Sequence, residues 1–307
     1  MNFKAEYISK LEVPTEKVDM ILDTDAYNEV DDQFAIAYAL LSPERINTVA
    51  ITAAPFANSK STGPKDGMEK SYAEIIKLLT LMGRETFAKE VYRGSEAFLP
   101  DENTPVVSAA AEKLVETARK YSPEKPLYIV ALGAITNVAS AILMDREAMV
   151  NNTVIVWLGG HALHWPDNRE FNLRQDVAGA RVLFGCGVPL VLLPCKGVVS
   201  ALTTTKGELK AWLENTNPLA EYLMNNAIRE AESYAKGTAW SRCIWDVSAV
   251  AWLMNDNDRF MTSYITSSPI PEYDNHYTVD PTRHPINYVY GIKRDAIFTD
   301  MFEKLRK

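Results

Sequence analysis

Two near-continuous apolar runs, residues 154–158 and 188–193, restrict the possible folds of this chain more than any other feature. Each run has the length of a β-strand, and a strand that is apolar on both sides is covered on both faces. Along the sequence, strand-length runs alternate with segments that carry apolar residues at helical spacing. This alternation is typical of a parallel sheet with helices on both faces. We therefore predict an α/β fold with an open, mostly parallel, Rossmann-like sheet.

The same periodicity places the other elements. Further strands are expected at 20–22, 46–53 and 127–132, and helices at 33–41, 68–82, 107–120, 137–143 and 295–305. The pattern is mostly helical over 209–254 and extended or irregular over 264–292. Two loops rich in Pro, Gly and polar residues, 55–67 and 161–169, are expected at the carboxyl edge of the sheet. Open α/β sheets bind their ligands at that edge.

The chain of 307 residues is long enough to bury one large core. Because composition does not change sharply at either loop, we predict an N-terminal arm, residues 1–17, followed by a single domain, residues 18–307. The arm is expected to be a surface segment or a short helix, since it contains no apolar stretch of signal-peptide length. No stretch of the chain reaches the ~20 apolar residues that a membrane-spanning helix needs.

Charge and cysteine content narrow the class of partner. The formal net charge is −8 and the pI is about 5.2, which argues against nucleic acid or an anionic membrane as the main partner. A small ligand with little or no charge is expected instead. The three cysteines, Cys186, Cys195 and Cys243, are odd in number and widely spaced. This pattern favours reduced thiols in a cytoplasmic protein over disulfides.

Four aspartates crowd the junction between the first strand and the first helix, in the sequence Asp23-Thr-Asp25-Ala-Tyr-Asn-Glu-Val-Asp31-Asp32. Carboxylates at this density repel one another unless a cation neutralises them. The stretch offers only oxygen ligands, which suit Ca²⁺ or Mg²⁺ better than Zn²⁺. Acidic residues also stabilise helix starts, so one or two of the four could serve only that purpose. We interpret the segment as a metal site at the mouth of the sheet.

Three later segments also carry polar residues near expected element ends: Gly133-Ala-Ile-Thr-Asn137, Gly159-Gly160 followed by Glu170-Phe-Asn172, and Trp245-Asp246. On an extended backbone Glu170 and Asn172 would share one face. Alone, Asp246 is more typical of a helix N-cap, and the segment at Gly133 of a tight strand-to-helix turn. No single segment decides the function.

Together and in this order, the four segments resemble the nucleoside hydrolase family of the inosine-uridine preferring type. The family pattern is D-x-D…D-D-x-x-A, G-x-x-T-N, G-G…E-F-N and a late aspartate that usually follows a histidine. The resemblance runs from about Asp19 to the C-terminus. It implies the nucleoside hydrolase fold and an enzyme of nucleoside catabolism that hydrolyses the N-glycosidic bond of a ribonucleoside to ribose and free base.

The resemblance also implies a role for each motif. The implied Ca²⁺ ligands are the side chains of Asp25, Asp32 and Asp246 and the backbone carbonyl of Leu132. Asp31 would accept a proton from the attacking water, and Asp23 would support the metal ligands from behind. The implied substrate-binding residues are Glu170, Asn172, Asn28, Asn58, Asn168, His164 and Trp245. Members of the family are usually homodimers or homotetramers, which sets the expectation for assembly.

The chain departs from the family pattern at three places. Five residues, 26–30, separate Asp25 from Asp31, where well-known members have three. Asn58 is the candidate for an asparagine that usually follows the second strand, and His164 and Asn168 compete for the loop asparagine before Glu170. The usual late histidine is Trp245 here.

Trp245 therefore leaves the proton donor to the departing base unassigned. An indole cannot protonate a purine, although it can stack on one, and Trp245 could equally be a core residue. His161 or His164 could supply the acid, or both could be solvated loop residues.

Two other functions remain open. A nucleoside- or ribose-binding protein without turnover is compatible with Trp245, whereas an aspartate at position 31 favours catalysis. An aspartate-nucleophile phosphohydrolase also begins with a strand and Asp-x-Asp. That class needs Thr or Val where this chain has Tyr27, and it leaves the segment 170–172 unexplained.

Overall fold

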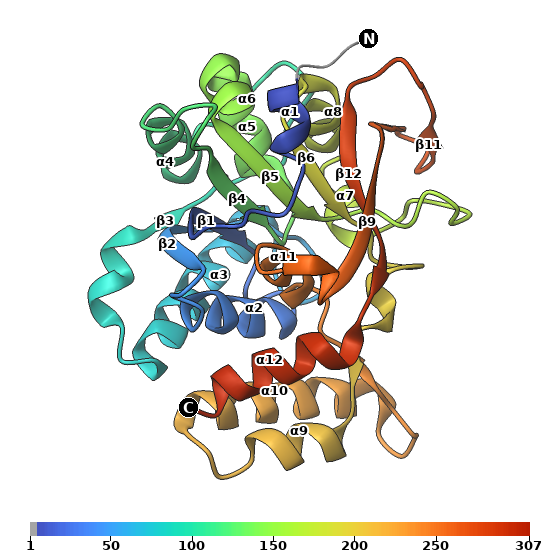
Figure 1. Cartoon of the computed structure of the whole chain (residues 1–307). Coiled ribbons are helices and arrows are strands. Elements are labelled where there is room, and N and C mark those ends of the chain that lie inside the picture. The colour runs from blue at the N-terminus through green and yellow to red at the C-terminus, as the bar shows by residue number, and fades with distance from the viewer. Residues whose placement is uncertain (1–4) are drawn as a thin grey trace.

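The chain is described here by a computed structural model that covers residues 5–307, with an eight-stranded sheet at its centre (Figure 1). The strands of this sheet are β1 Val18–Thr24, β2 Ile46–Ala53, β3 Val91–Arg93, β4 Leu127–Ala131, β5 Thr153–Leu158, β6 Leu190–Leu193, β9 Met261–Ser267 and β12 Pro285–Ile292. Their order across the sheet is β3-β2-β1-β4-β5-β6-β12-β9. Neighbours are parallel except β12 and β9, which pair antiparallel at one edge. The predicted mostly parallel α/β fold is confirmed.

Helices cover both faces of the sheet, as predicted. On one side lie α2 Asp31–Leu40, α3 Pro64–Leu81, α9 Lys206–Leu213, α10 Pro218–Ala235, α11 Val247–Trp252 and α12 Arg294–Leu305, and on the other α4 Ala109–Ala118, α5 Thr136–Met144, α6 Arg146–Asn152 and α8 Val177–Cys186. The remaining elements are the helices α1 Ala5–Ser9 and α7 Phe171–Gln175, the 3₁₀ helices Glu85–Glu90, Val199–Ala201 and Asp256–Asp258, and the short strands β7 Thr203–Thr204, β8 Arg242–Cys243, β10 Ile270–Pro271 and β11 Tyr277–Thr278. In Figure 1, α9, α10 and α12 form an outer layer below α2.

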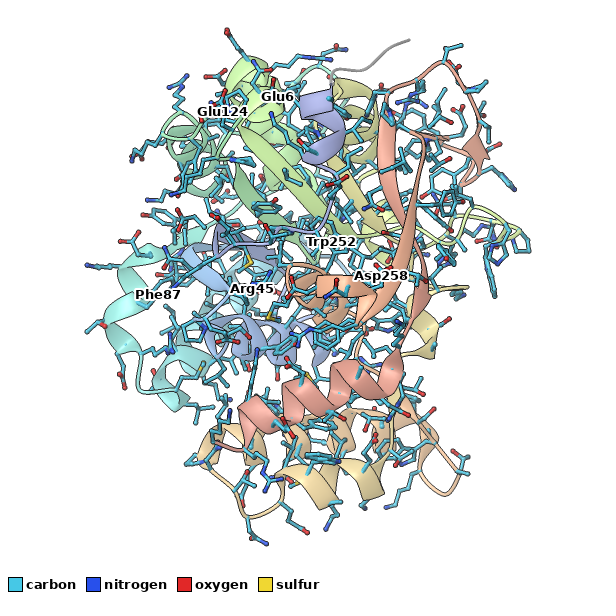
Figure 2. The ribbon with its side chains drawn as sticks, in the orientation of Figure 1. Glu6, Arg45, Phe87, Glu124, Trp252 and Asp258 are labelled. Carbon is cyan, nitrogen blue, oxygen red and sulfur yellow. The ribbon has the colours of Figure 1, made fainter. Side chains whose placement is uncertain are left out.

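Alternate residues of the central strands enter two separate apolar cores. Met20 and Leu22 of β1 pack with α2 and α3, whereas Ile21 packs with α4 and α5. This division follows from the strand geometry, since successive side chains point to opposite faces. Trp252 of α11 lies inside the first core and is fully buried (Figure 2).

The strand order creates a crevice at the carboxyl edge of the sheet. From β1 the chain moves to β2 and β3 on one side, and then to β4, β5 and β6 on the other. At such a switch point the loops that follow the two central strands diverge, which leaves room for a ligand. The segments after β1 and β4 are those that carry Asp25 and Gly133.

The structure differs from the sequence-based elements in some details. The short strand β3 and the helices α6 and α8 were not predicted, and α3 begins at Pro64, inside the expected loop 55–67. The segment 170–172 was predicted to be extended, and this is wrong: α7 begins at Phe171. Glu170 is its N-cap, and its carboxylate accepts hydrogen bonds from the backbone N–H groups of Asn172 and Leu173. An N-cap of this kind directs the following residues into a helix.

Within the expected N-terminal arm, Tyr7 and Leu11 contact the strands at one side of the sheet; residues 1–4 lie outside the described part. Leu11 is fully buried, and its carbonyl accepts a hydrogen bond from Asn287 of β12. The hydroxyl of Tyr7 donates to the carbonyls of Val188 and Pro285. Over residues 5–307, no helix combines the length and apolar character needed to cross a membrane.

Candidate active site

A cavity of about 270 Å³ opens at the switch-point crevice. Nine residues predicted from the sequence line it: Asp25, Asn28, Asp31, Asp32, Leu132, Glu170, Asn172, Trp245 and Asp246. They come from segments up to 221 positions apart in the sequence, from Asp25 to Asp246. The fold therefore brings the N-terminal and C-terminal motifs to one place.

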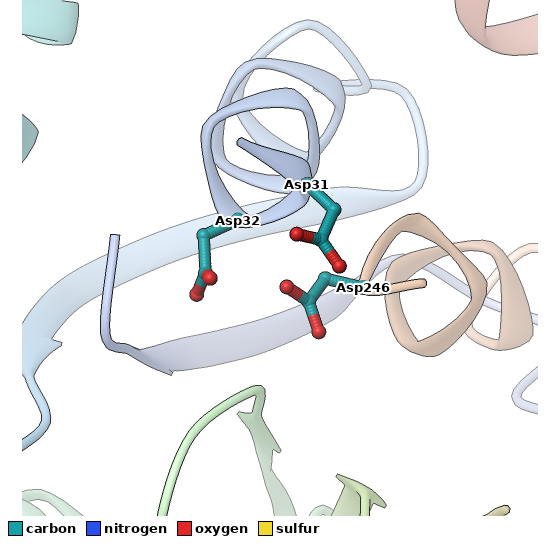
Figure 3. Close-up of side chains that lie close together, drawn as sticks. All are labelled: Asp31, Asp32 and Asp246. Atoms are coloured by element: carbon teal, nitrogen blue, oxygen red, sulfur yellow. The ribbon is translucent and has the colours of Figure 1, made fainter. Parts of the chain in front are cut away.

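Three carboxylates meet at the starts of two helices. Asp31 and Asp32 form the first turn of α2, and Asp246 immediately precedes α11. Asp246 occupies the N-cap position expected for a lone aspartate, but its side chain caps no backbone N–H group. Instead it faces Asp31 and Asp32, and one oxygen from each of the three lies within 4.8 Å of the others (Figure 3).

Burial makes this cluster costly without a cation. Asp25, Asp31, Asp32 and Asp246 are each 3% exposed or less. Burial, and then the neighbouring carboxylates Asp32 and Asp31, raise the pKa of Asp25 well above its usual range. Burial, and then Asp31 and Asp32, likewise raise the pKa of Asp246. For Asp32 burial raises the pKa to about 6.

Two oxygens of the cluster have no hydrogen-bond partner among the described residues. These are Oδ2 of Asp25 and Oδ1 of Asp31. Buried polar atoms in folded proteins are nearly always paired, so each unpaired atom calls for a physical explanation. The donor set here consists of hard oxygens only, with no thiolate or imidazole. The residues therefore fit a divalent cation such as Ca²⁺ or Mg²⁺.

Asp31 has a more cationic environment than its neighbours. Its Oδ2 accepts a hydrogen bond from the backbone N–H of Trp245 at 3.2 Å, and its Oδ1 lies 3.7 Å from the guanidinium of Arg242. Arg242 also pairs with Glu29 at 2.7 Å and Glu230 at 3.4 Å. Burial, and then Glu29, raise the pKa of Asp31 well above its usual range, and Arg242 opposes this rise. Arg242 thus favours the ionised carboxylate.

Asp23 lies behind the cavity and does not line it. Its Oδ1 accepts hydrogen bonds from Thr52 at 2.6 Å and Asn137 at 2.8 Å. Asn137 belongs to the G-x-x-T-N motif, so this motif holds Asp23. The glycine of the same motif, Gly133, lets the chain approach Asp25 closely, because a Cβ atom there would lie 3.0 Å from the Asp25 carboxyl carbon.

Glu170 and Asn172 form one wall of the cavity, and internal hydrogen bonds fix both side chains while leaving acceptor sites free. The Glu170 carboxylate accepts from three backbone N–H groups, including that of Gly160 at 2.9 Å. Asn172 donates to the carbonyls of Leu132 at 2.6 Å and Leu158 at 3.0 Å. A carbonyl has two lone pairs, so Leu132 keeps one acceptor site.

Some of the remaining predicted residues line the cavity, and others form hydrogen bonds to residues that line it. Asn28 lines the cavity, whereas Asn58 does not and donates a 2.7 Å hydrogen bond to the Asn28 side-chain oxygen. Asn168 is buried outside the lining and accepts from the backbone N–H of His161 at 2.7 Å. His164 is exposed and does not line the cavity, whereas His161 is buried and lines it. Trp245 lines the cavity and also packs against the core, so both of its predicted environments apply.

Several lining residues were not predicted from the sequence: Glu29, Leu158, Phe171, Cys195 and Lys196. Arg169 was expected only as the end of the loop 161–169 at the ligand-binding edge, with no role of its own. Arg242, which contacts Asp31 without lining the cavity, was also missed. Cys195 and Lys196 follow β6, which is the neighbour of β5 in the sheet. Their position just after a strand end was the only feature of the sequence that could have indicated a place in the site. Arg242 carried no sequence signal, because it reaches Asp31 only through tertiary packing.

Solved structures share this fold. A plant nucleoside hydrolase, the PpNRh1 enzyme, aligns with a TM-score of 0.73 and 20% identity over 94% of this chain and 99% of its own. The purine-preferring ribonucleoside hydrolase from Gardnerella vaginalis aligns with a TM-score of 0.71 and 20% identity over 94% of this chain and 98% of its own. At this identity the likeness shows the fold.

Two proteins that are similar in sequence are also named as enzymes that hydrolyse nucleosides. Probable uridine nucleosidase 2 from Arabidopsis thaliana is 28% identical over 229 residues, which cover 66% of this chain and 67% of that protein. The pyrimidine-specific ribonucleoside hydrolase RihA from Citrobacter koseri is 29% identical over 184 residues. That match covers 53% of this chain and 55% of the relative, so it spans about half of its length.

The family model described as inosine-uridine preferring nucleoside hydrolase matches residues 20–284. The predicted resemblance and the predicted enzyme class, hydrolysis of N-glycosyl compounds, are therefore confirmed, and the match favours a nucleosidase over a phosphohydrolase. The chain belongs to the inosine-uridine preferring nucleoside hydrolase family.

Proposed function

We propose that this protein hydrolyses the N-glycosidic bond of a ribonucleoside at the carboxylate cavity, in a reaction that depends on Ca²⁺. The observation that carries the proposal is the convergence of Asp31, Asp32 and Asp246 within 4.8 Å, next to the unpaired oxygen of Asp25. Asp25, Asp32, Asp246 and the carbonyl of Leu132 would hold the ion. When bound, Ca²⁺ would acidify the attacking water and orient the ribose hydroxyls.

Asp31 is the general base in this proposal. It accepts a proton from the water that attacks C1′, while the bond between C1′ and the base nitrogen breaks. The base leaves with the electron pair of that bond and takes up a proton from solvent. Arg242 and the backbone N–H of Trp245 favour the ionised form that a base requires. Positive charge develops on the sugar as the bond lengthens, and the buried carboxylates stabilise it electrostatically.

The other lining residues position the sugar and the base. Asn28, Glu170 and Asn172 bind ribose hydroxyls, and Trp245 stacks on the base as it leaves. Asp23, Asn58 and Asn168 act indirectly, since their hydrogen bonds hold lining segments. Relatives are named for pyrimidine and for purine nucleosides, so the proposal is limited to ribonucleosides as a class.

The finer assignments rest on chemistry and on the family. Ca²⁺ is proposed because every candidate ligand is an oxygen and because the family resemblance implies this ion rather than Mg²⁺. Cys186, Cys195 and Cys243 are unpaired thiols, which supports a cytoplasmic location. We also propose a homodimer or homotetramer, and a division of the chain into an arm, residues 1–17, and one catalytic domain, residues 18–307.

A nucleoside panel assayed for reducing sugar, with and without a chelator, tests this function. Ribose release that stops on chelation and returns with Ca²⁺ is the expected result. Calorimetric binding of ribose without turnover would instead support a nucleoside- or ribose-binding protein, which the tryptophan at position 245 keeps as the second candidate. Turnover that is indifferent to chelation would contradict the role of the ion.

A further inference from the structure

The two ends of the cavity carry opposite charge. The aspartates lie at the β1 side of the crevice, whereas His161, Arg169 and Lys196 line the cavity from the loops that follow β5 and β6. Within residues 5–307, neither Arg169 nor Lys196 forms an ion pair. Two unpaired cations thus border a cavity whose other side is acidic.

His161 supplies a buried donor at the same wall. It is 3% exposed, and its Nδ1 accepts a hydrogen bond from the backbone N–H of Lys196 at 3.4 Å. In the neutral ring the proton then lies on Nε2, which is buried and has no partner. Burial, and then the charge of Lys196, lower the pKa of His161, so the ring is neutral at pH 7.

Two carboxylates, Asp167 and Glu170, offset part of this charge. Asp167 accepts a hydrogen bond from the backbone N–H of Arg169 at 2.9 Å. That hydrogen bond lowers the pKa of Asp167, and His161, Arg169 and Lys196 lower it further. Asp167 does not line the cavity, whereas both cations do. Glu170, the residue after Arg169, also lines the cavity, and three backbone N–H groups donate to its carboxylate. A ligand at this wall therefore meets two unpaired cations and one carboxylate that is already hydrogen-bonded.

The proposed reaction places C1′ of the substrate beside Asp31. In ribose, C1′ and C4′ flank the two carbons that bear the 2′- and 3′-hydroxyls, so the arm on C4′ lies across the ring from C1′. A sugar seated in this way can place C5′ on the side away from α2, where the loops after β5 and β6 line the cavity. These loops lie two to three strand spacings from β1, about 10–15 Å, which leaves room for a substituent on C5′.

We infer that His161, Arg169 and Lys196 form a subsite for a phosphate on C5′, so that the preferred substrate is a 5′-phosphorylated riboside. The inference rests on the proposed function, because that function places C1′ of the sugar at Asp31. An arginine and a lysine beside a buried N–H donor provide the charge and hydrogen bonds that a phosphate group requires.

Calorimetry with ribose and ribose 5-phosphate, in the presence of Ca²⁺, tests the subsite. We expect ribose 5-phosphate to bind at least ~10-fold more tightly than ribose, with an advantage that shrinks as ionic strength rises. In the double variant Arg169→Gln, Lys196→Gln the ratio of the two affinities should fall toward one. Both side chains are exposed, so the variant is expected to fold.

The double variant Lys89→Gln, Lys236→Gln is the matched control, since it removes two exposed cations away from the cavity. It should keep the wild-type affinity ratio. Equal affinities for the two sugars in the wild type, or an equal loss in the control, would overturn the subsite. If equal affinities coincide with chelator-sensitive hydrolysis of unphosphorylated nucleosides, the proposed function stands and only the phosphate subsite fails. If neither sugar binds, the phosphate subsite fails, and the nucleoside assay alone decides the proposed function.

Discussion

Asp31 and Asp176 are alike in burial and position but differ in their partners. Each is 3% exposed or less, and each lies at the start of a helix. The oxygens of Asp176 accept hydrogen bonds from Thr136 and from the backbone N–H groups of Leu99 and Gly179. Oδ1 of Asp31 accepts none. Burial alone therefore does not distinguish a structural carboxylate from one that can bind a ligand. In this pair the distinguishing feature is a buried oxygen without a hydrogen-bond partner.

The largest effect is expected from Asp31→Asn. An amide cannot accept a proton from water, so kcat should fall by about 10³–10⁴. The free energy of unfolding should stay the same or rise, since the substitution removes a buried charge. Steady-state kinetics and thermal unfolding measure the two quantities. An unchanged kcat would show that another residue is the general base.

Asp246→Asn should weaken Ca²⁺ binding by more than about 100-fold, because it removes a charged ligand from the proposed ion. Calorimetric titration of Ca²⁺ into wild type and variant measures the change. Asp176→Asn serves as the control, since Asp176 does not line the cavity. An unchanged affinity in Asp246→Asn would remove that residue from the metal site.

Asp176→Asn tests the other half of the comparison. An amide cannot accept all the hydrogen bonds of the carboxylate, and its NH₂ group would face N–H donors. We expect the free energy of unfolding to fall by about 2–3 kcal/mol, with kcat of the folded protein within about threefold of wild type. Chemical denaturation checks the first quantity. A stable variant with low kcat would assign Asp176 to the reaction.

The carboxylate cluster also predicts how pH and Ca²⁺ act together. Burial raises the pKa of Asp32 from 3.8 to about 6, so without metal the folded state holds this proton more tightly than the unfolded state. The stability that results is complete below pH 3.8 and is lost as pH rises through about 6. Ca²⁺ binds the ionised form. The rise in Tm on adding Ca²⁺ should therefore be larger at pH 7.5 than at pH 5, and an equal rise would contradict the site.

The smallest effect is expected from His164→Ala. The side chain is exposed and does not line the cavity, so kcat/KM should change by less than about threefold. A larger loss would show that His164 contributes to substrate binding, as the sequence predicted.

The sequence predicted those parts of the fold and site that are encoded locally. The apolar runs at 154–158 and 188–193 identified buried strands, and the aspartates around position 31 identified the start of α2, because a parallel sheet places such junctions at one edge. The ordered motifs added Asp246, which no local pattern links to Asp31.

The sequence did not predict contacts between residues that only the tertiary fold brings together. Arg242 reaches Asp31 from β8, and Lys196 joins His161 only because β5 and β6 are neighbours. The helix α7 was missed because the alternation of Glu170 and Asn172 is compatible with a strand, whereas the N-cap bonds of Glu170 form only in the folded loop. Spacing alone did not distinguish these conformations.

A crystal structure of the protein grown with Ca²⁺ and a ribose analogue tests the central claim most directly. We expect one ion bound by oxygens of Asp25, Asp32 and Asp246 at about 2.3–2.6 Å, together with the two hydroxyls of the sugar. A cavity that holds the sugar without an ion, or an ion bound elsewhere, would contradict that claim.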